Sequence, residues 1–488
     1  MPPGEPFSFD EAFRRAITEL MRLSSVTDPL AARFTAAGHE LYLVGGPVRD
    51  ALLGRQTADL DFTTDARPEQ ILPIVAPLGA TWTTGITFGT VGVQIGEHRC
   101  EITTFRSDSY DPTSRKPQVE FGDTVEGDLI RRDFTVNAMA VALPVDAARP
   151  IVDPSGGLDD LGAGVLRTPI EPEQSFADDP LRMLRAARFA AQLGFEIEAG
   201  TYAAVTEMTD RLAIVSAERV RDELTKLMVA PNPRLGLTVL VDTGMADLVL
   251  PEVARLRETV DEHRRHKDVY AHTLTVLEQA IALEPDGPDL VLRLSALLHD
   301  IGKPKTKSLD PSGKVSFHHH EVVGASMTRT RLTALRYPKD IVEDVSRLVE
   351  LHLRFHGYSG GAWTDAAVRR YVRDAGPLLD RLHRLTRSDC TTRNARKAAA
   401  LAAAYDSLEE RIAELAERED LAAIRPDLDG NDIMAELGIG PGRTVGEAYR
   451  HLLALRIEHG PMTRDEALGA LRQWAAEQGV GPATSAPE

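Results

Sequence analysis

Two aspartates separated by one residue, Asp59 and Asp61, are the first side chains whose types and spacing could do chemistry. Residues i and i+2 of a β-strand point to the same face of a sheet, so these carboxylates converge if they lie on a strand. Converging carboxylates favour a cation between them, and Mg²⁺ is the cation that such oxygens bind beside nucleotide phosphates. Two such ions would activate an attacking 3′-hydroxyl and neutralise a leaving pyrophosphate. Glu101, on a later strand-like segment, is a candidate third ligand.

A glycine pair, Gly45 and Gly46, lies shortly before these aspartates. Apolar residues before the pair favour a strand, and the residues after it favour a helix that runs through Leu53. Glycine lets a polyphosphate approach the backbone closely, and the first N–H groups of a helix are free to bind an anion. Arg49 can add a charge-assisted contact. The segment is therefore predicted to bind a triphosphate next to the aspartates.

Short strands and helices must position these side chains. The region 38–150 alternates strand-like and helix-like segments, which predicts an α+β head with a mixed sheet. Residues 7–37 are expected to form helices with a break at Thr27-Asp28-Pro29, as an N-terminal helical extension over 1–37. The strands are expected at 41–44, 59–63, 90–95 and 100–105, and 135–143 is expected to combine a helix with a strand.

After residue 150 the apolar residues follow a helical period throughout. We expect an all-helical neck over 151–255, a helical metal-binding domain over 256–400 and a helical tail over 401–488. The helices with the clearest period are 180–193, 217–228, 289–298, 341–353, 395–418 and 447–457.

A second set of residues with metal-ligand chemistry lies between residues 272 and 389. Its imidazole and carboxylate groups suit Mg²⁺, Mn²⁺, Fe or Ni²⁺. His352 and His356 are four residues apart, which would place them on one face of a helix. Histidines that only pack inside a helical body are the alternative, and which of three adjacent histidines would bind is open. The set is His272, His299, Asp300, His318, His319, His320, His352, His356 and Asp389.

The composition limits the classes of protein to which the chain can belong. It has 56 Lys and Arg against 74 Asp and Glu, a net charge of −18. A nucleic-acid partner must therefore be held by local arginine clusters. The two cysteines, Cys100 and Cys390, exclude a disulfide framework and a cysteine-rich zinc site and fit a reducing cytoplasm. No signal peptide is evident, and the apolar runs are too short to span a membrane.

Four motifs in order resemble those of the nucleotidyltransferase superfamily, in the form found in bacterial-type CCA-adding enzymes and bacterial poly(A) polymerases. They comprise the glycine pair with Asp-Leu-Asp, then 131–138, 153–161 and 178–189. The resemblance implies that the first motif binds triphosphate and metal. It also implies that Arg132 and Asp133 hold the ribose 2′-hydroxyl. Arg185 and Arg188 follow Arg182 at three-residue spacing and are expected to face the triphosphate or the tRNA end, with a solvated helix face as the alternative.

Asp179 and Arg182 lie at the position to which this family assigns base selection. Arginine only donates hydrogen bonds, and a carboxylate only accepts them. Cytosine and adenine each present a ring acceptor beside an amino donor, whereas uracil and guanine would turn a carbonyl oxygen toward the carboxylate. The pair therefore predicts a protein template for C and A. Asp178 departs from the family, which usually has Glu there.

The histidine set resembles the HD phosphohydrolase superfamily. That resemblance implies one metal held by four ligands and candidate ligands for a second metal. The first group is His272, His299, Asp300 and Asp389, and the second is His320, His352 and His356.

These features together predict a tRNA nucleotidyltransferase that adds CCA from CTP and ATP without a nucleic-acid template, with Mg²⁺ at the head. A poly(A) polymerase, or a partial enzyme that adds only A or only CC, shares every head motif and stays open. An HD phosphohydrolase with a regulatory head is a further alternative. The arginines of 381–397 form either an RNA face or a solvated helix, and the glycine turn 438–442 is either a tRNA phosphate contact or a plain helix–helix turn.

Overall fold

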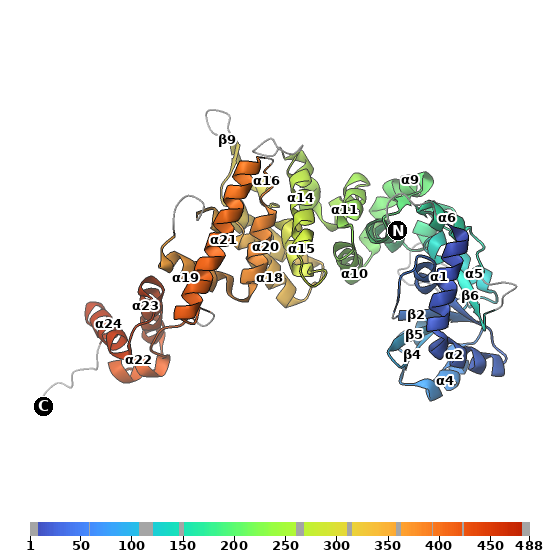
Figure 1. Ribbon diagram of the computed structural model, residues 1–488, viewed down its shortest axis with the longest axis horizontal. Helices are drawn as coiled ribbons and strands as arrows, with labels where there is room; N and C mark the ends of the chain where they lie inside the picture. Colours follow the sequence, from blue (N-terminus) through green and yellow to red (C-terminus); the bar gives the residue numbers. More distant parts are fainter. Residues whose placement is uncertain are drawn as a thin grey trace. The chain divides into compact units, whose positions relative to one another are not determined.

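The computed structural model describes residues 8–57, 59–106, 121–145, 151–259, 268–309, 315–357, 363–392, 394–421 and 424–480. The chain divides into two compact units, Met1–Ala254 and Arg255–Glu488. The first unit contains the sheet and the helices that follow it, and the second is almost entirely helical (Figure 1). The α+β fold class expected from the sequence is confirmed.

The sheet of the first unit has six strands in the order β3-β4-β5-β2-β1-β6. Neighbouring strands are antiparallel except β2 and β5, which run parallel. Helix α2 (Ser24–Ala36) packs on β1 and β6, and α4 (Pro68–Val75) packs on β4 and β5. The strands are β1 (Leu41–Val44), β2 (Asp59–Thr64), β3 (Thr81–Trp82), β4 (Thr90–Ile95), β5 (His98–Thr104) and β6 (Ala140–Leu143).

One face of this sheet is buried and the other carries the polar side chains of the motifs. In β2, Leu60 and Phe62 belong to a core shared with the N-terminal helices, and their side chains are fully buried. Because side chains alternate along a strand, Asp59 and Asp61 lie on the opposite face and are exposed. The apolar residues of the strand thus decide where the carboxylates point.

The N-terminal helices differ from the expected pattern. Helix α1 (Phe9–Arg22) ends at Leu23, and α2 (Ser24–Ala36) runs through Pro29, so the break expected at Thr27-Asp28-Pro29 is wrong. Proline removes one backbone hydrogen bond, here in the first turns of α2. Leu30 and Phe34 are fully buried beyond it, and their packing outweighs the lost bond.

The rest of the first unit is a series of short helices with one small parallel ladder between β7 (Val165–Leu166) and β8 (Glu196–Ile197). Helix α8 packs against α10 and α11. The helices are α3 (Gly46–Leu52), α4 (Pro68–Val75), α5 (Val125–Ile130), α6 (Gly157–Ala163), α7 (Pro172–Asp178), α8 (Leu181–Leu193), α9 (Ala199–Met208), α10 (Ala217–Met228), α11 (Pro233–Asp242), α12 (Met245–Val249) and α13 (Pro251–Ala254), with 3₁₀ turns η1 (Ala76–Leu78), η2 (Ile86–Phe88), η3 (Thr135–Asn137) and η4 (Thr209–Ile214).

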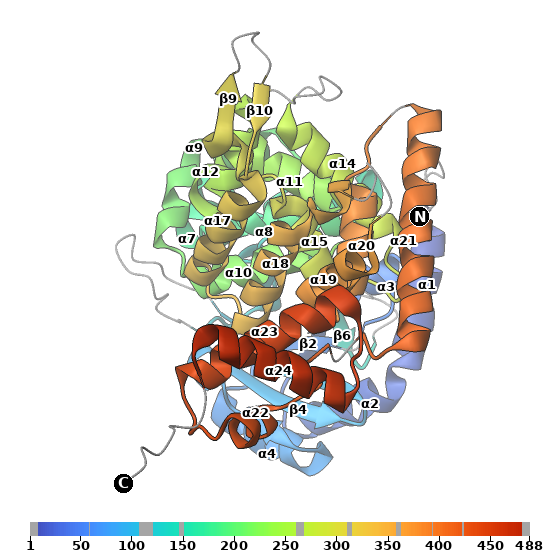
Figure 2. The ribbon, with the colours of Figure 1, turned by 90° about the vertical axis from the view of Figure 1, so that its left-hand side faces the viewer.

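The second unit is built of helices, with one hairpin of β9 (Lys307–Leu309) and β10 (Val315–Phe317) that Figure 2 shows beyond α17. Helix α14 packs on α15, and α17 packs on α18. The helices are α14 (Val269–Ala282), α15 (Leu290–Leu298), α16 (Lys303–Thr306), α17 (His320–Ala334), α18 (Lys339–Leu351), α19 (Asp365–Ala375), α20 (Leu379–Ser388), α21 (Ala395–Arg418), α22 (Gly430–Leu437), α23 (Arg443–His459) and α24 (Arg464–Gln478), with 3₁₀ turns η5 (Arg255–Glu258), η6 (Arg354–Gly357) and η7 (Gly376–Leu378).

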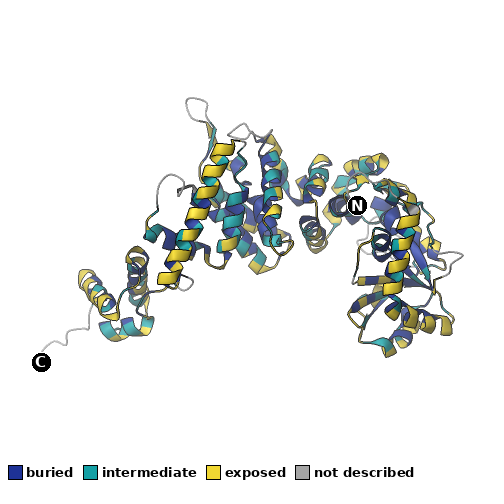
Figure 3. Ribbon diagram, viewed as in Figure 1, coloured by how far each residue is buried: buried dark blue, intermediate teal, exposed yellow. Residues whose placement is uncertain are grey.

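The end of the second unit has its own core. Leu428, Ile433, Leu452 and Leu471 are fully buried in a cluster that joins α22, α23 and α24. Helix α21, by contrast, buries few side chains and is mostly exposed along its length (Figure 3). None of the helices among the described residues is long and apolar enough to cross a membrane.

Candidate active site and metal centre

The head carboxylates come from two parallel strands. The register places Asp61 beside Glu101 and Asp59 beside Arg99. Glu101 accepts a hydrogen bond from Arg99, with 3.0 Å between Nη2 and Oε1. Among the described residues, the oxygens of Asp59, Asp61 and Glu101 do not all lie within 4.8 Å of one another. The two aspartates therefore face one side as expected, while Glu101 is engaged by an arginine.

Negative charge is concentrated at Asp61. Its pKa is raised, first because the surrounding protein desolvates the carboxyl, and also because Glu101 and Asp59 add negative charge, while Arg132 opposes the rise. The side chain itself is exposed, so the desolvation comes from the walls around the carboxyl and not from enclosure. A cation beside Asp61 would relieve this repulsion, and the carboxylates fit Mg²⁺ in that respect.

The glycine turn lies between β1 and α3. Gly45 has φ 73°, and a side-chain Cβ there would approach Nη1 of Arg132 to 3.0 Å. The turn therefore needs glycine and brings an arginine against it. Arg49 is buried and donates hydrogen bonds to Asp50 and Asn137, so it supports the turn from inside.

Asp133 is a buried carboxylate with several donors around it. Its Oδ1 accepts from the Phe134 N–H at 2.8 Å and from Asn137, and its Oδ2 accepts from Nε of Arg185 at 2.7 Å. Burial alone would raise its pKa, but Arg185, the Asn137 hydrogen bond and Arg182 outweigh burial and lower it. The neighbouring arginine, Arg132, lies 3.0 Å from buried Asp128.

The predicted template pair is joined through the backbone, where the Arg182 N–H donates to the Asp179 carbonyl at 3.0 Å, while the two side chains bond to other groups. Asp179 is the C-cap residue of α7, and Arg182 lies in the first turn of α8. Arg182 is buried and donates to the Ser175 hydroxyl at 2.8 Å and to the Arg131 carbonyl at 2.5 Å. Asp179 accepts from the Leu181 N–H at 3.1 Å. Each side chain is thus held separately.

Two residues of α10 complete this region. The sequence identified their segment only as a capped helix, and Ser216 does cap it. Arg219 pairs with Asp179 at 2.7 Å, and buried Glu223 pairs with Arg188 at 2.6 Å. Arg219 and Glu223 are four residues apart and therefore share one helix face. This spacing is the sequence feature that could have identified them as part of the site.

Arg185 and Arg188 point at acids of the first unit. Arg185 bonds Asp133 and lies 4.0 Å from Glu223, which also binds Arg188. Both guanidinium groups lie over the ring of Phe189, Arg188 at 3.9 Å and Arg185 at 5.6 Å from its centroid. These arginines therefore organise the junction of the head motifs with α8.

The second unit gathers the HD residues into one buried cluster. Nε2 of His272 lies 3.0 Å from Oδ1 of Asp389, and Nε2 of His299 lies 3.6 Å from the same oxygen. Asp300 faces both histidines through Oδ2, at 3.5 Å from His272 and 3.2 Å from His299. His272, His299 and Asp389 thus form one set of possible metal ligands.

Asp300 also faces a second set. Its Oδ1 lies 3.2 Å from Nε2 of His320, and Asp300, His320 and His352 form a further group with metal-ligand spacing. Lys303 lies 2.8 Å from Oδ2 of the same carboxylate. Asp300 therefore stands between the two sets, with one oxygen toward each.

Backbone carbonyls orient the histidine rings. Nδ1 of His299, His320 and His352 bonds the carbonyls of Ala296, Phe317 and Val349, at 2.9, 2.7 and 2.6 Å. An Nδ1–H that donates to a carbonyl leaves Nε2 with a free lone pair, as metal-bound histidines require.

The protonation of the cluster fits a cation. Nε2 of His352 is buried and has no hydrogen-bond partner, and burial and the charge of His299 lower the pKa of His352 to about 3. Burial opposes a charge on His299, yet Asp300 and Asp389 raise its pKa to about 10. Asp300 and the unpartnered Nε2 of His352 belong to one set of closely spaced ligand atoms, and Asp389 belongs to the other. The negative charge of these two carboxylates fits a divalent cation in the cluster.

Two of the candidate histidines fall outside the cluster, and the side chain of a third is not described. His318 and His319 are exposed, and His319 has φ 61°, a left-handed turn that directs the next residue, His320, inward. Helix α18 ends at Leu351, so the expectation that His352 and His356 share a helix face is wrong. His356 lies in η6, and its side chain lies outside the described residues.

The arginines of 381–397 are mostly engaged in ion pairs. Arg381 pairs with Asp289 at 2.7 Å, and Arg387 with Asp406 at 2.8 Å. Arg384 pairs with Asp380, and Arg393 lies outside the described residues. The glycine turn after α22 caps that helix through Gly438, as a plain helix–helix turn does.

Three family models match the chain. Residues 41–167 match the poly A polymerase head domain. Residues 194–256 match a probable RNA and SrmB-binding site of polymerase A, and residues 269–422 match the HD domain.

Two relatives are similar to most of the chain, and a third is similar to about half of it. An A-adding tRNA nucleotidyltransferase of Deinococcus radiodurans is 36% identical over 89% of this chain and 95% of its own. A CC-adding tRNA nucleotidyltransferase of Thermus thermophilus is 31% identical over 89% and 94%. A CCA-adding enzyme of Lactobacillus helveticus is 39% identical over 47% and 56%.

The fold also matches solved structures. The CCA-adding enzyme of Bacillus stearothermophilus in complex with CTP has a TM-score of 0.62 at 24% identity, over 96% of this chain and 98% of its own. The Thermotoga maritima CCA-adding enzyme complexed with tRNA has a TM-score of 0.57 at 18% identity, over 96% and 98%. At these identities the likeness concerns the fold.

Proposed function

The chain belongs to the tRNA nucleotidyltransferase and poly(A) polymerase family, and we propose that it completes the CCA end of tRNA from CTP and ATP without a nucleic-acid template. One observation carries the proposal. A single compact unit contains two exposed aspartates on one strand, Asp59 and Asp61, and two residues that could read a base. These are Asp179, a hydrogen-bond acceptor, and Arg182, a donor, and each is held by its own hydrogen bonds at the start of α8. The free cysteines accord with a cytoplasmic location.

The head residues divide the work of nucleotidyl transfer. Asp59 and Asp61 would hold Mg²⁺, which when bound activates the primer 3′-hydroxyl and neutralises pyrophosphate. Glu101 can join them if it exchanges its Arg99 partner for the cation. Arg132, which the resemblance assigns to the ribose, lies against Gly45, and from there it would also offer charge-assisted hydrogen bonds to the triphosphate. The aspartates thus hold the cation at the reacting phosphate, and the arginine adds positive charge beside the triphosphate.

Ribose recognition falls to Asp133. The low pKa keeps this carboxylate ionised, so it accepts a hydrogen bond from a 2′-hydroxyl. A deoxyribonucleotide lacks that donor and forgoes this hydrogen bond. Arg185 keeps the carboxylate in place while it does so.

Base selection depends on Asp179 and Arg182. Arg182 donates toward the ring nitrogen of C or A, and Asp179 accepts from the amino group. Arg219 holds one oxygen of Asp179, which fixes the direction of the carboxylate. U and G would turn a carbonyl oxygen toward that carboxylate and are rejected by repulsion.

The names of the relatives make a partial activity the nearest rival. The two relatives that cover most of the chain are named for adding A and for adding CC. The proposal is tested with tRNA transcripts that end before CCA, after the first C and after CC, each incubated with CTP, with ATP and with both. Full activity gives two C from CTP and a terminal A from ATP. Extension of only the CC-ended transcript, by ATP alone, would replace the proposal with A addition.

The buried cluster supports a second activity, hydrolysis of a phosphate ester at a divalent metal. The observation behind it is the position of Asp300 between two sets of histidines. His272, His299, Asp389 and Asp300 would hold one ion, and His320 and His352 a second, with Mn²⁺, Ni²⁺, Fe or Mg²⁺ as candidates. When bound, such ions supply a nucleophilic hydroxide at neutral pH. Hydrolysis of a phosphomonoester or a 2′,3′-cyclic phosphodiester with Mn²⁺ or Ni²⁺ tests it, and no turnover with any of the four metals would exclude it.

A further inference from the structure

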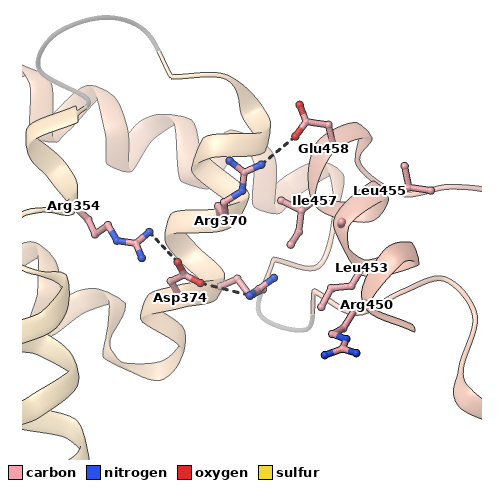
Figure 4. Close-up of a pocket in the computed structure, with 10 residues that line it drawn as sticks. Arg354, Arg370, Asp374, Arg450, Leu453, Leu455, Ile457 and Glu458 are labelled. Carbon is pink, nitrogen blue, oxygen red and sulfur yellow. Dashed lines mark hydrogen bonds and ion pairs between the residues drawn. The ribbon is translucent and has the colours of Figure 1, made fainter. Parts of the chain in front are cut away.

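A cationic pocket lies in the second unit, and none of the residues that line it belongs to the two sets of possible metal ligands. It has a volume of about 650 Å³ and opens between η6, α19 and α23. Figure 4 shows Arg354 and Asp374 on one side of it and Arg450 and Leu453 on the other. Its apolar lining comes from Leu453 and Ile457 of α23. The pocket therefore joins an arginine rim to an apolar wall.

The arginines of the rim outnumber their acids. Arg354 lies 3.0 Å and Arg373 3.7 Å from Asp374, so two guanidinium groups share one carboxylate. Arg370 pairs with Glu458 at 3.1 Å. Arg450 makes no ion pair with any described residue and donates only to the Gly446 carbonyl of its own helix. Four positive charges thus face two negative ones, in a chain whose net charge is strongly negative.

A buried ion network fixes the helices that form this rim. Arg369 of α19 donates to Glu419 at 2.8 Å and to the Ile457 carbonyl at 3.1 Å. Arg456 of α23 pairs with the other oxygen of Glu419. Since Arg369 and Glu419 are 7% and 2% exposed at the side chain, this network holds α19 and α23 in one arrangement. The rim arginines are therefore preorganised.

We propose that this pocket binds phosphates of the tRNA backbone, as a grip separate from the reacting 3′ end. The proposal rests on the proposed tRNA substrate. Guanidinium groups bind phosphate through paired, charge-assisted hydrogen bonds. The apolar wall suits the sugar faces that separate successive phosphates. An acidic protein needs such a local cluster to hold RNA, because its overall field repels the polymer.

Exposure favours a polymer over a small phosphate compound. Small ligands are mostly enclosed by their sites. The side chains of Arg354, Arg370 and Arg373 are 49%, 53% and 41% exposed, and Arg450 is also exposed. Half-exposed arginines suit a backbone that passes across the rim and continues beyond it.

Charge reversal at Arg450 tests the proposal, because this arginine has no ion pair whose loss would destabilise the fold. Arg443→Glu is the matched control: it makes the same change of charge on the same helix, at a 90% exposed side chain outside the pocket. Both full-length variants and the unaltered protein are assayed for tRNA binding without nucleotide, at several salt concentrations, and for extension. Arg450→Ala is measured alongside, and circular dichroism checks folding.

Arg450→Glu is expected to weaken tRNA binding about tenfold and to reduce the slope of log affinity against log salt by about 1. The KM for CTP and ATP and the kcat at saturating tRNA should stay unchanged, and Arg443→Glu should stay within about twofold of the unaltered protein. Arg450→Ala should give a smaller loss in the same direction.

Unchanged tRNA binding in folded Arg450→Glu, or an equal loss in Arg443→Glu, would overturn the proposal. Binding of inorganic phosphate or ATP that Arg450→Glu abolishes without changing tRNA affinity would also overturn it, in favour of a small phosphate ligand. If the unaltered protein fails to extend tRNA while Arg450→Glu still weakens tRNA binding, the proposed function is wrong, but the proposal that the pocket binds tRNA is supported.

Discussion

The two candidate metal sites differ in the burial of their ligand side chains and in how firmly hydrogen bonds hold those side chains before a metal binds. At the head, Asp59 and Asp61 are exposed, and Glu101 is engaged by an arginine. In the second unit, His299 and Asp300 are fully buried, and backbone carbonyls orient the rings. An open pair of carboxylates suits a metal that arrives with a nucleotide, whereas a closed set suits a metal that stays with the protein.

The largest effect is expected from the exposed aspartates. Asp59→Ala or Asp61→Ala should reduce nucleotide addition by about three orders of magnitude or more, because transition-state charge is no longer neutralised. Thermal stability and tRNA binding should be preserved, since neither side chain belongs to the core. Glu69→Ala, at another exposed acid of the first unit, is the control. If the variants add nucleotides at rates near that of the unaltered protein, the assignment of Asp59 and Asp61 as the metal ligands is wrong.

The buried cluster should behave in the opposite way. A protein purified in the presence of Mn²⁺ should keep a divalent ion through dialysis, and the double variant His299→Ala, Asp300→Ala should lose it. CCA addition should be unaffected in that variant, because the aspartates lie in the other compact unit. Metal analysis and extension assays check both statements. Equal metal content in both proteins would show that the cluster holds no ion.

The template pair should affect choice of base more than folding. Arg182→Ala should lower both rate and selectivity, because it removes the donor. Asp179→Ala should relax the exclusion of UTP by about ten- to a hundredfold, because the repelling carboxylate is absent. Competition between UTP and CTP on one transcript measures the ratio. If both variants keep the original preference, the base is selected elsewhere.

The smallest effect is expected at the residue that only positions the template. Arg219→Ala should relax discrimination against UTP by a few fold, because Asp179 keeps its bond to the Leu181 N–H. Arg219→Lys should restore most of it, which a purely structural defect would not predict. A matched control is Arg221→Ala, two residues along the same helix, where the arginine pairs with its neighbour Asp222. Equal effects of the two variants would assign Arg219 no special role.

Local patterns were enough to predict most of the head. The strands β1 and β4 have the expected bounds, because each is a short apolar run between turn residues. The shared face of Asp59 and Asp61 follows from strand alternation alone. The break at Pro29 could not be predicted, because the burial of Leu30 and Phe34 outweighs a local signal.

Partners distant in the sequence could not be predicted. Arg185 binds Asp133, 52 residues away, and Arg219 binds Asp179, 40 residues away. No periodicity contains such contacts, because they arise only when α8 packs against the head in one case and α10 against the end of α7 in the other. The pocket at Arg450 could not be predicted for the same reason, because the arginines of its rim come from segments far apart in the chain. The choice of His320 among three histidines required the left-handed turn at His319.

The most direct test of the account is the sequence of the product when all four nucleotides compete. A tRNA transcript that ends before CCA is incubated with equal concentrations of CTP, ATP, UTP and GTP, and its new 3′ ends are sequenced. The account predicts CCA on nearly all extended molecules, because Asp179 and Arg182 accept only C and A. Frequent U or G, a long run of A, or no extension at all would contradict it.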